Sequence, residues 1–338
     1  SSPSWATIYS GLSSNRTGIT NNAFQGLNFK NEDNNLKNNK ENTIFNYICE
    51  ENMKTIKNKT KNKTTNNTKN IKKKKSVMVY SGPWNGIHII SNYKGKTGCG
   101  IDKNIRILNN KLQKNISKKL FENESLEMEK KSEKRSIEYC LKYIDKPSYN
   151  FVGFFSHLLD SVGHKYGFDY RVKEYTDTIK DTDLLIKKIL DKIEIRKKEN
   201  PDEEWLIIIT TDHGGTSRKY MKQTKKGIKQ LREFDKDKQI NIISQHKAEG
   251  IHGSNNIKEH RDTFLIISNN KRKINKRKTI KNRNTIKNRN TIKNRKTKNL
   301  ITKKIISKDI SPTIIKFLFN EGKNKENILK NMEGKSII

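Results

Sequence analysis

Four short apolar segments along the chain have the pattern of buried β-strands. They are "SVMVYSG" (76–82), "NFVGFFS" (150–156), "EWLIIITT" (204–211) and "RDTFLIIS" (261–268). Each is rich in β-branched or aromatic residues, as strands are. The second and third are apolar without polar alternation, and such strands belong to sheets that are covered on both faces.

Between the second and third of these strands, the apolar positions repeat at helical spacing. Asn200 and Pro201 end this predicted helix, and the stretch 157–169 before it is interpreted as a loop. A strand, a helix and a further strand form a right-handed parallel unit. The sequence therefore predicts an α/β fold with a mostly parallel central sheet flanked by helices on both faces. The apolar positions of the helix are Tyr175, Ile179, Ile186, Leu190 and Ile193.

Other segments give weaker helical signals. A helix is predicted near 4–11, and a closing helix over 306–320, with Asp309 or Ser311 near its cap and Pro312 in its first turn. The charged stretch 103–135 is predicted to be partly helical, but no packed face is evident there.

Composition sets the size of the folded part. The chain has 338 residues, of which 31% are hydrophobic and 32% charged, which is enough apolar material for one sizeable domain. The net charge of +36 is spread through lysine- and asparagine-rich tracts rather than gathered on one predicted face. We expect low-complexity insertions at about 30–75, 218–247 and 270–300, because such tracts bury too little apolar surface to fold. Nucleic-acid binding is therefore not expected as the main role, and no apolar run is long enough to span a bilayer.

Acidic and imidazole side chains follow two of the predicted strands. Asp160 and His164 come after the strand 150–156, Asp212 and His213 come directly after the strand 204–211, and His252 lies in "GIHGSNN". Ligands of open parallel sheets bind at the carboxyl ends of the strands. Each group alone favours an ordinary turn or cap. Together, two carboxylates and three imidazoles predict a zinc-type site.

The spacing of these residues resembles the alkaline phosphatase superfamily, most closely its type I phosphodiesterase/nucleotide pyrophosphatase family. The D-x-x-G-H-x-x-G motif is found at 160–167, the T-D-H-G motif at 211–214, and the H-G motif at 252–253. The D-I-x-P-T motif is found at 309–313, followed by "EGKSI" at 333–337. The resemblance implies one catalytic domain over 1–338 that hydrolyses phosphoric esters.

The beginning of the chain also resembles this family, whose nucleophile lies two residues before a proline. Here that position is Ser1, and Asn22 matches the asparagine that contacts the phosphoryl oxygens of the substrate. Thr17 and Ser14 depart from the usual His and Pro of this stretch. A role of Ser1 as a helix cap stays open. Trp84 is a candidate for the wall of the substrate pocket, with a place in the core as the alternative.

The resemblance further implies two divalent metal ions, expected to be zinc. Asp160, His164 and His252 would hold one ion, and Asp212, His213 and the Ser1 oxygen the other. The family also uses an Asp of the first strand, upstream of the nucleophile, and we expect this chain to lack that strand. An ion would lower the pKa of the serine hydroxyl, and the reaction would pass through a phosphoseryl intermediate. The resemblance suggests a secretory or membrane-associated location.

Three alternatives compete with a phosphodiesterase. A sulfatase would carry Arg where this chain has Trp5, which argues against it. A phosphomonoesterase shares the metal ligands, because specificity lies in the walls of the pocket. A non-catalytic relative that binds polyanions is the alternative of another class. The sequence leaves the oligomeric state open.

Overall fold

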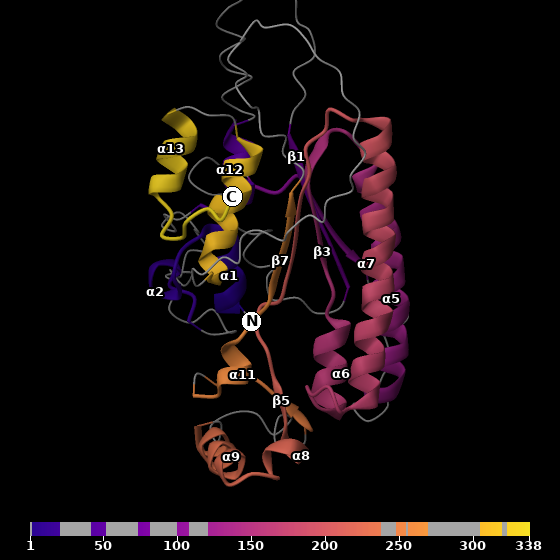
Figure 1. Ribbon diagram of the computed structural model, residues 1–338, viewed down its shortest axis with the longest axis vertical. Helices are drawn as coiled ribbons and strands as arrows, with labels where there is room; N and C mark the ends of the chain where they lie inside the picture. Colours follow the sequence, from indigo (N-terminus) through magenta and orange to yellow (C-terminus); the bar gives the residue numbers. More distant parts are fainter. Residues whose placement is uncertain are drawn as a thin grey trace, which may run out of the picture.

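The computed structural model of the chain describes residues 2–20, 42–51, 74–81, 100–107, 121–237, 248–254, 256–269, 305–319 and 323–338. In chain order, the elements are α1 (Ser2–Ser10), α2 (Ser14–Thr17), β1 (Lys75–Ser81), β2 (Lys103–Ile107), α5 (Phe121–Ile144), β3 (Tyr149–Phe155), α6 (Leu158–Tyr166), α7 (Lys173–Glu199), β4 (Leu206–Thr210), β5 (Thr216–Ser217), α8 (Arg218–Met221), α9 (Lys225–Asp237), β6 (Gly250–Ile251), α11 (Lys258–Arg261), β7 (Leu265–Asn269), the 3-10 helix η3 (Ser307–Asp309), α12 (Ile310–Leu318) and α13 (Lys323–Lys330) (Figure 1).

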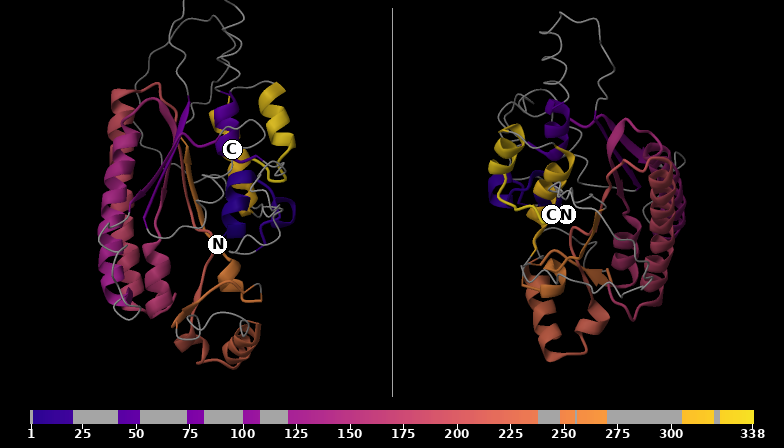
Figure 2. Two further views of the ribbon diagram at one scale, coloured as in Figure 1. Left: turned by 180° about the vertical axis from the view of Figure 1, so that it is seen from behind. Right: turned by 45° about the horizontal axis from the view of Figure 1, so that its top comes forward.

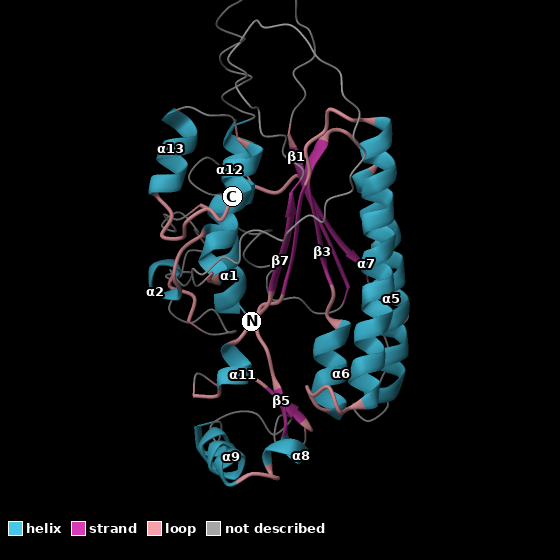
Figure 3. Cartoon of the chain, in the orientation of Figure 1, coloured by secondary structure: helices cyan, strands magenta, loops and turns pink. Residues whose placement is uncertain are grey.

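The central sheet is parallel, as the sequence predicts. β1 lies between β2 and β3 and pairs in parallel with both, so that Val79 is opposite Ile105 and Phe154. β4 departs from the predicted parallel unit, because it pairs antiparallel with β7, with Ile208 opposite Ile267. The four strands predicted from apolar runs are all present, and the mixed α/β fold is consistent with an alkaline phosphatase-like architecture (Figure 3).

Helices cover both faces of the strands, which explains the continuous apolar runs. On β1, Val77 and Val79 face α5, whereas Met78 and Tyr80 face the opposite layer. The first layer contains α5 and α7, and Cys140 and Ile193 pack there against β3 and β4. The second layer contains α1, α12 and α13, which lie together on the other side of the sheet in both views of Figure 2.

Two stretches predicted to be low-complexity insertions contain helices. Within 30–75, residues 44–51 are helical, and the side chains of Ile44, Phe45 and Ile48 are completely buried in the second layer. Within 218–247, α8 and α9 pack with residues of 251–257 around a small core of Met221, Leu231, Phe234, Ile251 and Ile257. These helices correct the prediction for both stretches, because the few apolar residues stand at helical spacing inside a basic sequence. The stretch 270–300 lies outside the described residues.

Other helices also differ from the sequence-based prediction. The predicted loop 157–169 contains α6, and the charged stretch 103–135 contains β2 and the first part of α5. The predicted helices near 4–11 and 306–320 are present as α1 and as η3 followed by α12. Among the described helices, none combines the length and hydrophobicity that crossing a bilayer requires.

The D-I-x-P-T motif ties the end of the chain to the domain. The Asp309 carboxylate accepts hydrogen bonds from the backbone N–H groups of Ile306 (3.1 Å) and Lys335 (2.7 Å). The Thr313 hydroxyl accepts from the N–H of Ile337 at 3.0 Å. The motif and the "EGKSI" segment, which the sequence separates, therefore form one structural unit.

Candidate metal centre

α6 presents two of the predicted ligands on one face. Asp160 lies in its first turn and His164 one turn later, and residues four apart in a helix point to the same side. Gly163 lies between them, where a Cβ atom would overlap the ring of Phe168. The helix begins directly beyond the end of β3, and the end of β4 lies on the same side of the molecule (Figure 1).

The other ligands come from two loops that a short strand pair holds together. Asp212 and His213 follow β4, and His252 follows β6. β5 pairs antiparallel with β6, which brings the two loops together. Gly250 in β6 approaches α6 so closely that a Cβ atom would overlap the Gly163 carbonyl oxygen. The Gly250 carbonyl in turn lies 3.1 Å from Nδ1 of His164.

A buried histidine, His260, links the same two loops through hydrogen bonds. Its Nδ1 accepts a hydrogen bond from the Ser254 N–H at 3.2 Å, so its Nε2 carries the proton and donates to the Thr216 hydroxyl at 2.8 Å. Its carbonyl accepts from the Gly214 N–H at 3.2 Å. The positions of His213 and His252 are therefore coupled through side-chain and backbone bonds.

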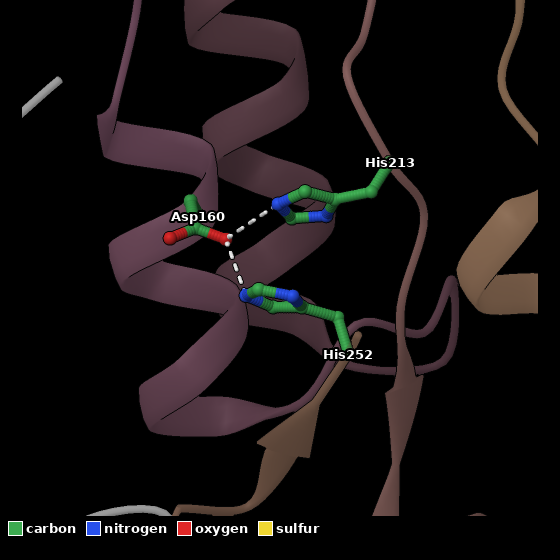
Figure 4. Close-up of side chains that lie close together, drawn as sticks. All are labelled: Asp160, His213 and His252. Carbon is green, nitrogen blue, oxygen red and sulfur yellow. Dashed lines mark ion pairs between the residues drawn. The ribbon is translucent and has the colours of Figure 1, made fainter. Parts of the chain in front are cut away.

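The Asp160 carboxylate lies at the centre of this arrangement. Its Oδ1 is 3.5 Å from Nε2 of His252 and 3.9 Å from Nε2 of His213 (Figure 4). Its Oδ2 is 3.6 Å from Nε2 of His164. These separations are longer than a hydrogen bond, and Oδ1 is buried with no hydrogen-bond partner among the described residues. Because a buried carboxylate oxygen needs a partner, the arrangement fits a cation between these atoms.

The imidazoles are as close to one another as to the carboxylate. Nε2 of His164 and Nε2 of His252 are 3.0 Å apart, and the rings of His213 and His252 stack with 3.8 Å between centroids. Burial, followed by the nearby His213 and His164, lowers the pKa of His252 far below its ordinary value. A neutral imidazole is the form that binds metal ions.

The donor set matches a divalent metal. Asp160, His213 and His252 each offer one ligand atom, and these atoms all lie within 4.8 Å of one another. His164 extends this group through its contacts with Asp160 and His252, and Asp212 Oδ2 lies 3.5 Å from Nε2 of His213. Nitrogen and oxygen donors in this mixture suit zinc. The structure thus brings all five predicted metal ligands together.

The structure adds a histidine and a glutamate that sequence reasoning missed. His157, the N-cap residue of α6, has its Nε2 3.5 Å from Asp160 Oδ2 and its Nδ1 2.7 Å from the Glu129 carboxylate. Burial opposes protonation of His157, but the hydrogen bond to Glu129 and the carboxylates of Asp160 and Asp212 outweigh it and raise the pKa. The i, i+3 spacing from Asp160 would have indicated His157 if 158–166 had been interpreted as a helix.

A second buried acid lies one turn along α5 from Glu129. The Glu133 carboxylate accepts a hydrogen bond from Ser156, and burial raises its pKa to about 7. The Ser156 bond opposes this shift, whereas Glu129 adds to it. α5 therefore supplies two carboxyl groups next to the metal site: Glu129 contacts His157, and Glu133 contacts Ser156.

The remaining predicted site residues, Ser1, Asn22 and Trp84, lie outside the described residues. The helix that follows Ser1 is described, and it passes close to the site. Burial raises the pKa of Tyr9 on α1 far above its ordinary value, and the Asp212 carboxylate adds to the shift. α1 therefore runs beside the Asp212 side of the centre.

The chain is similar to a known protein family. The sequence model described as type I phosphodiesterase / nucleotide pyrophosphatase matches residues 1–321. The match covers most of the chain and includes every residue of the centre. No individual curated protein matches the chain significantly.

Proposed function

Because the chain belongs to the type I phosphodiesterase/nucleotide pyrophosphatase family, within the alkaline phosphatase superfamily, we propose that it hydrolyses phosphoric ester bonds at a metal centre around Asp160. The family acts on phosphodiester and pyrophosphate bonds and is typically metal-dependent. One observation carries the proposal for this chain. One helix and two loops bring Asp160, His213 and His252 together, and in the described part of the chain the buried Oδ1 of Asp160 has no hydrogen-bond partner (Figure 4).

We propose that the centre holds two divalent ions, most consistent with zinc. By family resemblance, Asp160, His164 and His252 bind one ion, while Asp212 and His213 bind the other together with the Ser1 oxygen. When bound, such ions stabilise the negative charge of an in-line phosphoryl displacement and lower the pKa of a coordinated hydroxyl. His252 and the buried Asp160 supply one nitrogen and one oxygen donor, a combination that suits zinc.

We further propose that Ser1 is the nucleophile and that Asn22 donates hydrogen bonds to the non-bridging phosphoryl oxygens. Support comes from the Ser-x-Pro pattern at the beginning of the chain and from its match to the family. The path of α1 beside Asp212 is compatible with this placement, because α1 begins at Ser2. Trp84 is proposed to line the substrate pocket by stacking on a ring of the substrate.

Substitution of a ligand tests the proposal. We expect His252→Ala to lower hydrolysis of an aryl phosphodiester at least ~100-fold, because a metal ligand is removed. Leu184→Ala is the control, since Leu184 is 60% exposed on α7. Full turnover by His252→Ala would contradict the assignment.

The choice of substrate is tested separately. A panel of aryl phosphodiester, phosphomonoester and sulfate ester substrates distinguishes the proposed activity from a monoesterase and from a sulfatase. We expect the diester to have the highest kcat/KM. If no ester is hydrolysed and RNA or heparin binds in a salt-sensitive way, the non-catalytic alternative is favoured.

We also propose a secretory or membrane-associated location. Cys49 is disulfide-bonded, and disulfides persist in oxidising compartments. Fractionation of cells that express the full-length protein tests this, and recovery only with cytosolic markers would contradict it.

A further inference from the structure

The environment of His157 is like that of the predicted metal ligands rather than that of an ordinary ion pair. In a metal-binding histidine, one ring nitrogen binds the metal and the other donates its proton to a carboxylate or a backbone carbonyl. His164 and His213 follow this pattern, with their Nδ1 atoms 3.1 Å from the carbonyls of Gly250 and Gly214. His157 follows it with a stronger acceptor, because its Nδ1 lies 2.7 Å from the Glu129 carboxylate.

The other nitrogen of His157 points at the centre. Its Nε2 lies 3.5 Å from Asp160 Oδ2. Two ligand atoms bound to one tetrahedral zinc ion are about 3.3 Å apart, given metal–ligand distances of about 2 Å. The His252 and His164 contacts with Asp160 have nearly the same length, 3.5 and 3.6 Å. The His157 contact therefore has the separation of a ligand pair and is too long for a direct hydrogen bond.

The two oxygens of Asp160 face different imidazoles. Oδ1 faces His213 and His252, whereas Oδ2 faces His157 and His164. Asp160, His157 and His164 all belong to one helical face, at spacings of three and four residues. Imidazoles therefore lie beside both oxygens of Asp160, and the Oδ2 side has two of them next to it.

We propose that His157 is a further metal ligand, which binds through Nε2 on the Oδ2 side of Asp160, and that Glu129 orients its ring. This inference rests on the proposed metal-dependent function and deepens it. It assigns α5 a part in the centre, because Glu129 comes from that helix. The Ser161 hydroxyl, 3.0 Å from Nδ1 of His157, supports the same ring orientation.

An alternative role of His157 is a structural ion pair with Glu129 and Asp160. The two roles differ in two measurable properties, the number of bound ions and their affinity. A structural ion pair would change folding stability and leave metal affinity as it is. A ligand would change the affinity for metal directly, and its orienting carboxylate would change it to a smaller extent.

The experiment titrates the chelator-treated full-length chain with Zn²⁺ and with Co²⁺, and follows bound metal by elemental analysis and Co²⁺ absorption. We expect two ions in the unsubstituted protein. His157→Asn should lose one ion or bind it at least ~10-fold more weakly, with an altered Co²⁺ spectrum. Asparagine keeps a polar group near Glu129 but is too short to replace Nε2.

Two further variants keep the test decisive if His157→Asn fails to fold. Glu129→Gln should keep both ions and weaken one by about 10- to 100-fold. Glu194→Gln is the matched control, because Glu194 is an exposed glutamate on α7 that pairs with Lys197. The inference about His157 would be overturned if His157→Asn left the stoichiometry, the affinity and the spectrum unchanged, or if Glu129→Gln left the affinity unchanged. Either result would leave the proposed function intact. Absence of metal binding by the unsubstituted protein would instead overturn the proposed function.

Discussion

Asp160 Oδ1 lies 3.5 Å from Nε2 of His252, although one residue belongs to α6 and the other follows β6, far along the chain. A hydrogen bond does not account for this approach, because the distance between the two atoms is too long. An ion pair does not account for it either, because burial lowers the pKa of His252 and favours the neutral imidazole. A cation between the two atoms accounts for both observations.

Metal binding is expected to stabilise the folded chain through Asp160. An ion that binds only the native state stabilises it by about 2.7 kcal/mol at 100 times its Kd. Zinc should therefore raise Tm of the chelator-treated protein, and Asp160→Asn should abolish most of this rise. Thermal unfolding with and without zinc measures the effect. Asp191→Asn, at an exposed carboxylate of α7, is the matched control. An equal rise in both variants would refute the central role of Asp160.

Glu133 is expected to make stability fall as the pH rises. Its folded pKa is about 7, above the ordinary value of 4.5, because burial disfavours the charged carboxylate. The folded state therefore holds the proton more tightly, and stability is lost as the pH rises from 4.5 through 7.

Substitution of Glu133 by Gln removes this loss. Between about pH 5 and pH 8, Glu133→Gln should gain roughly 2 to 3 kcal/mol relative to the unsubstituted protein, as measured by urea unfolding. Glu194→Gln should show no such gain, since the Glu194 side chain is 62% exposed. Parallel pH profiles for Glu133→Gln and the unsubstituted protein would disprove the burial argument.

Asp309 is expected to contribute to the folding stability of the chain and not to metal binding. Asp309→Ala would leave the partly buried N–H groups of Ile306 and Lys335 without their charged acceptor, which costs about 2 to 3 kcal/mol. Chemical denaturation should show this loss, while the metal content of the folded protein stays unchanged. Asp191→Ala serves as the exposed control. Loss of bound metal from folded Asp309→Ala would show that the motif belongs to the centre.

Gly250 is expected to control the approach of β6 to α6. Gly250→Ala would place a methyl group against the Gly163 carbonyl and move His252 away from Asp160. We expect metal affinity to fall at least ~10-fold, because the ligands lose their positions. Gly227→Ala is a matched control, since its Cβ would also meet a backbone carbonyl, that of Met221, between α8 and α9. Equal affinities of the two variants would contradict the positional role.

The strands and the metal ligands could be predicted from the sequence because their signals are local. An apolar run such as 204–211 identifies a buried strand, and Asp212 directly after it has one place to lie, at the end of that strand. The helix at 44–51 was missed because its few apolar residues stand in an asparagine-rich sequence. α6 was missed because glycines at 163 and 167 are typical of loops.

The pairing of His157 with Glu129 could not be predicted in the same way. It depends on how α5 packs across α6, and that packing is decided by tertiary contacts such as those of Leu126, Leu158 and Val162. Similarly, nothing local to β4 indicates that it pairs with β7 in the antiparallel sense. Non-local pairings follow from the assembled layers and not from periodicity.

The most direct test of the metal centre is anomalous X-ray diffraction at the zinc absorption edge, from crystals of the full-length chain grown with zinc. We predict an anomalous peak about 2 Å from Asp160 Oδ1 and from Nε2 of His252. Zinc peaks elsewhere with none at Asp160 would contradict the account.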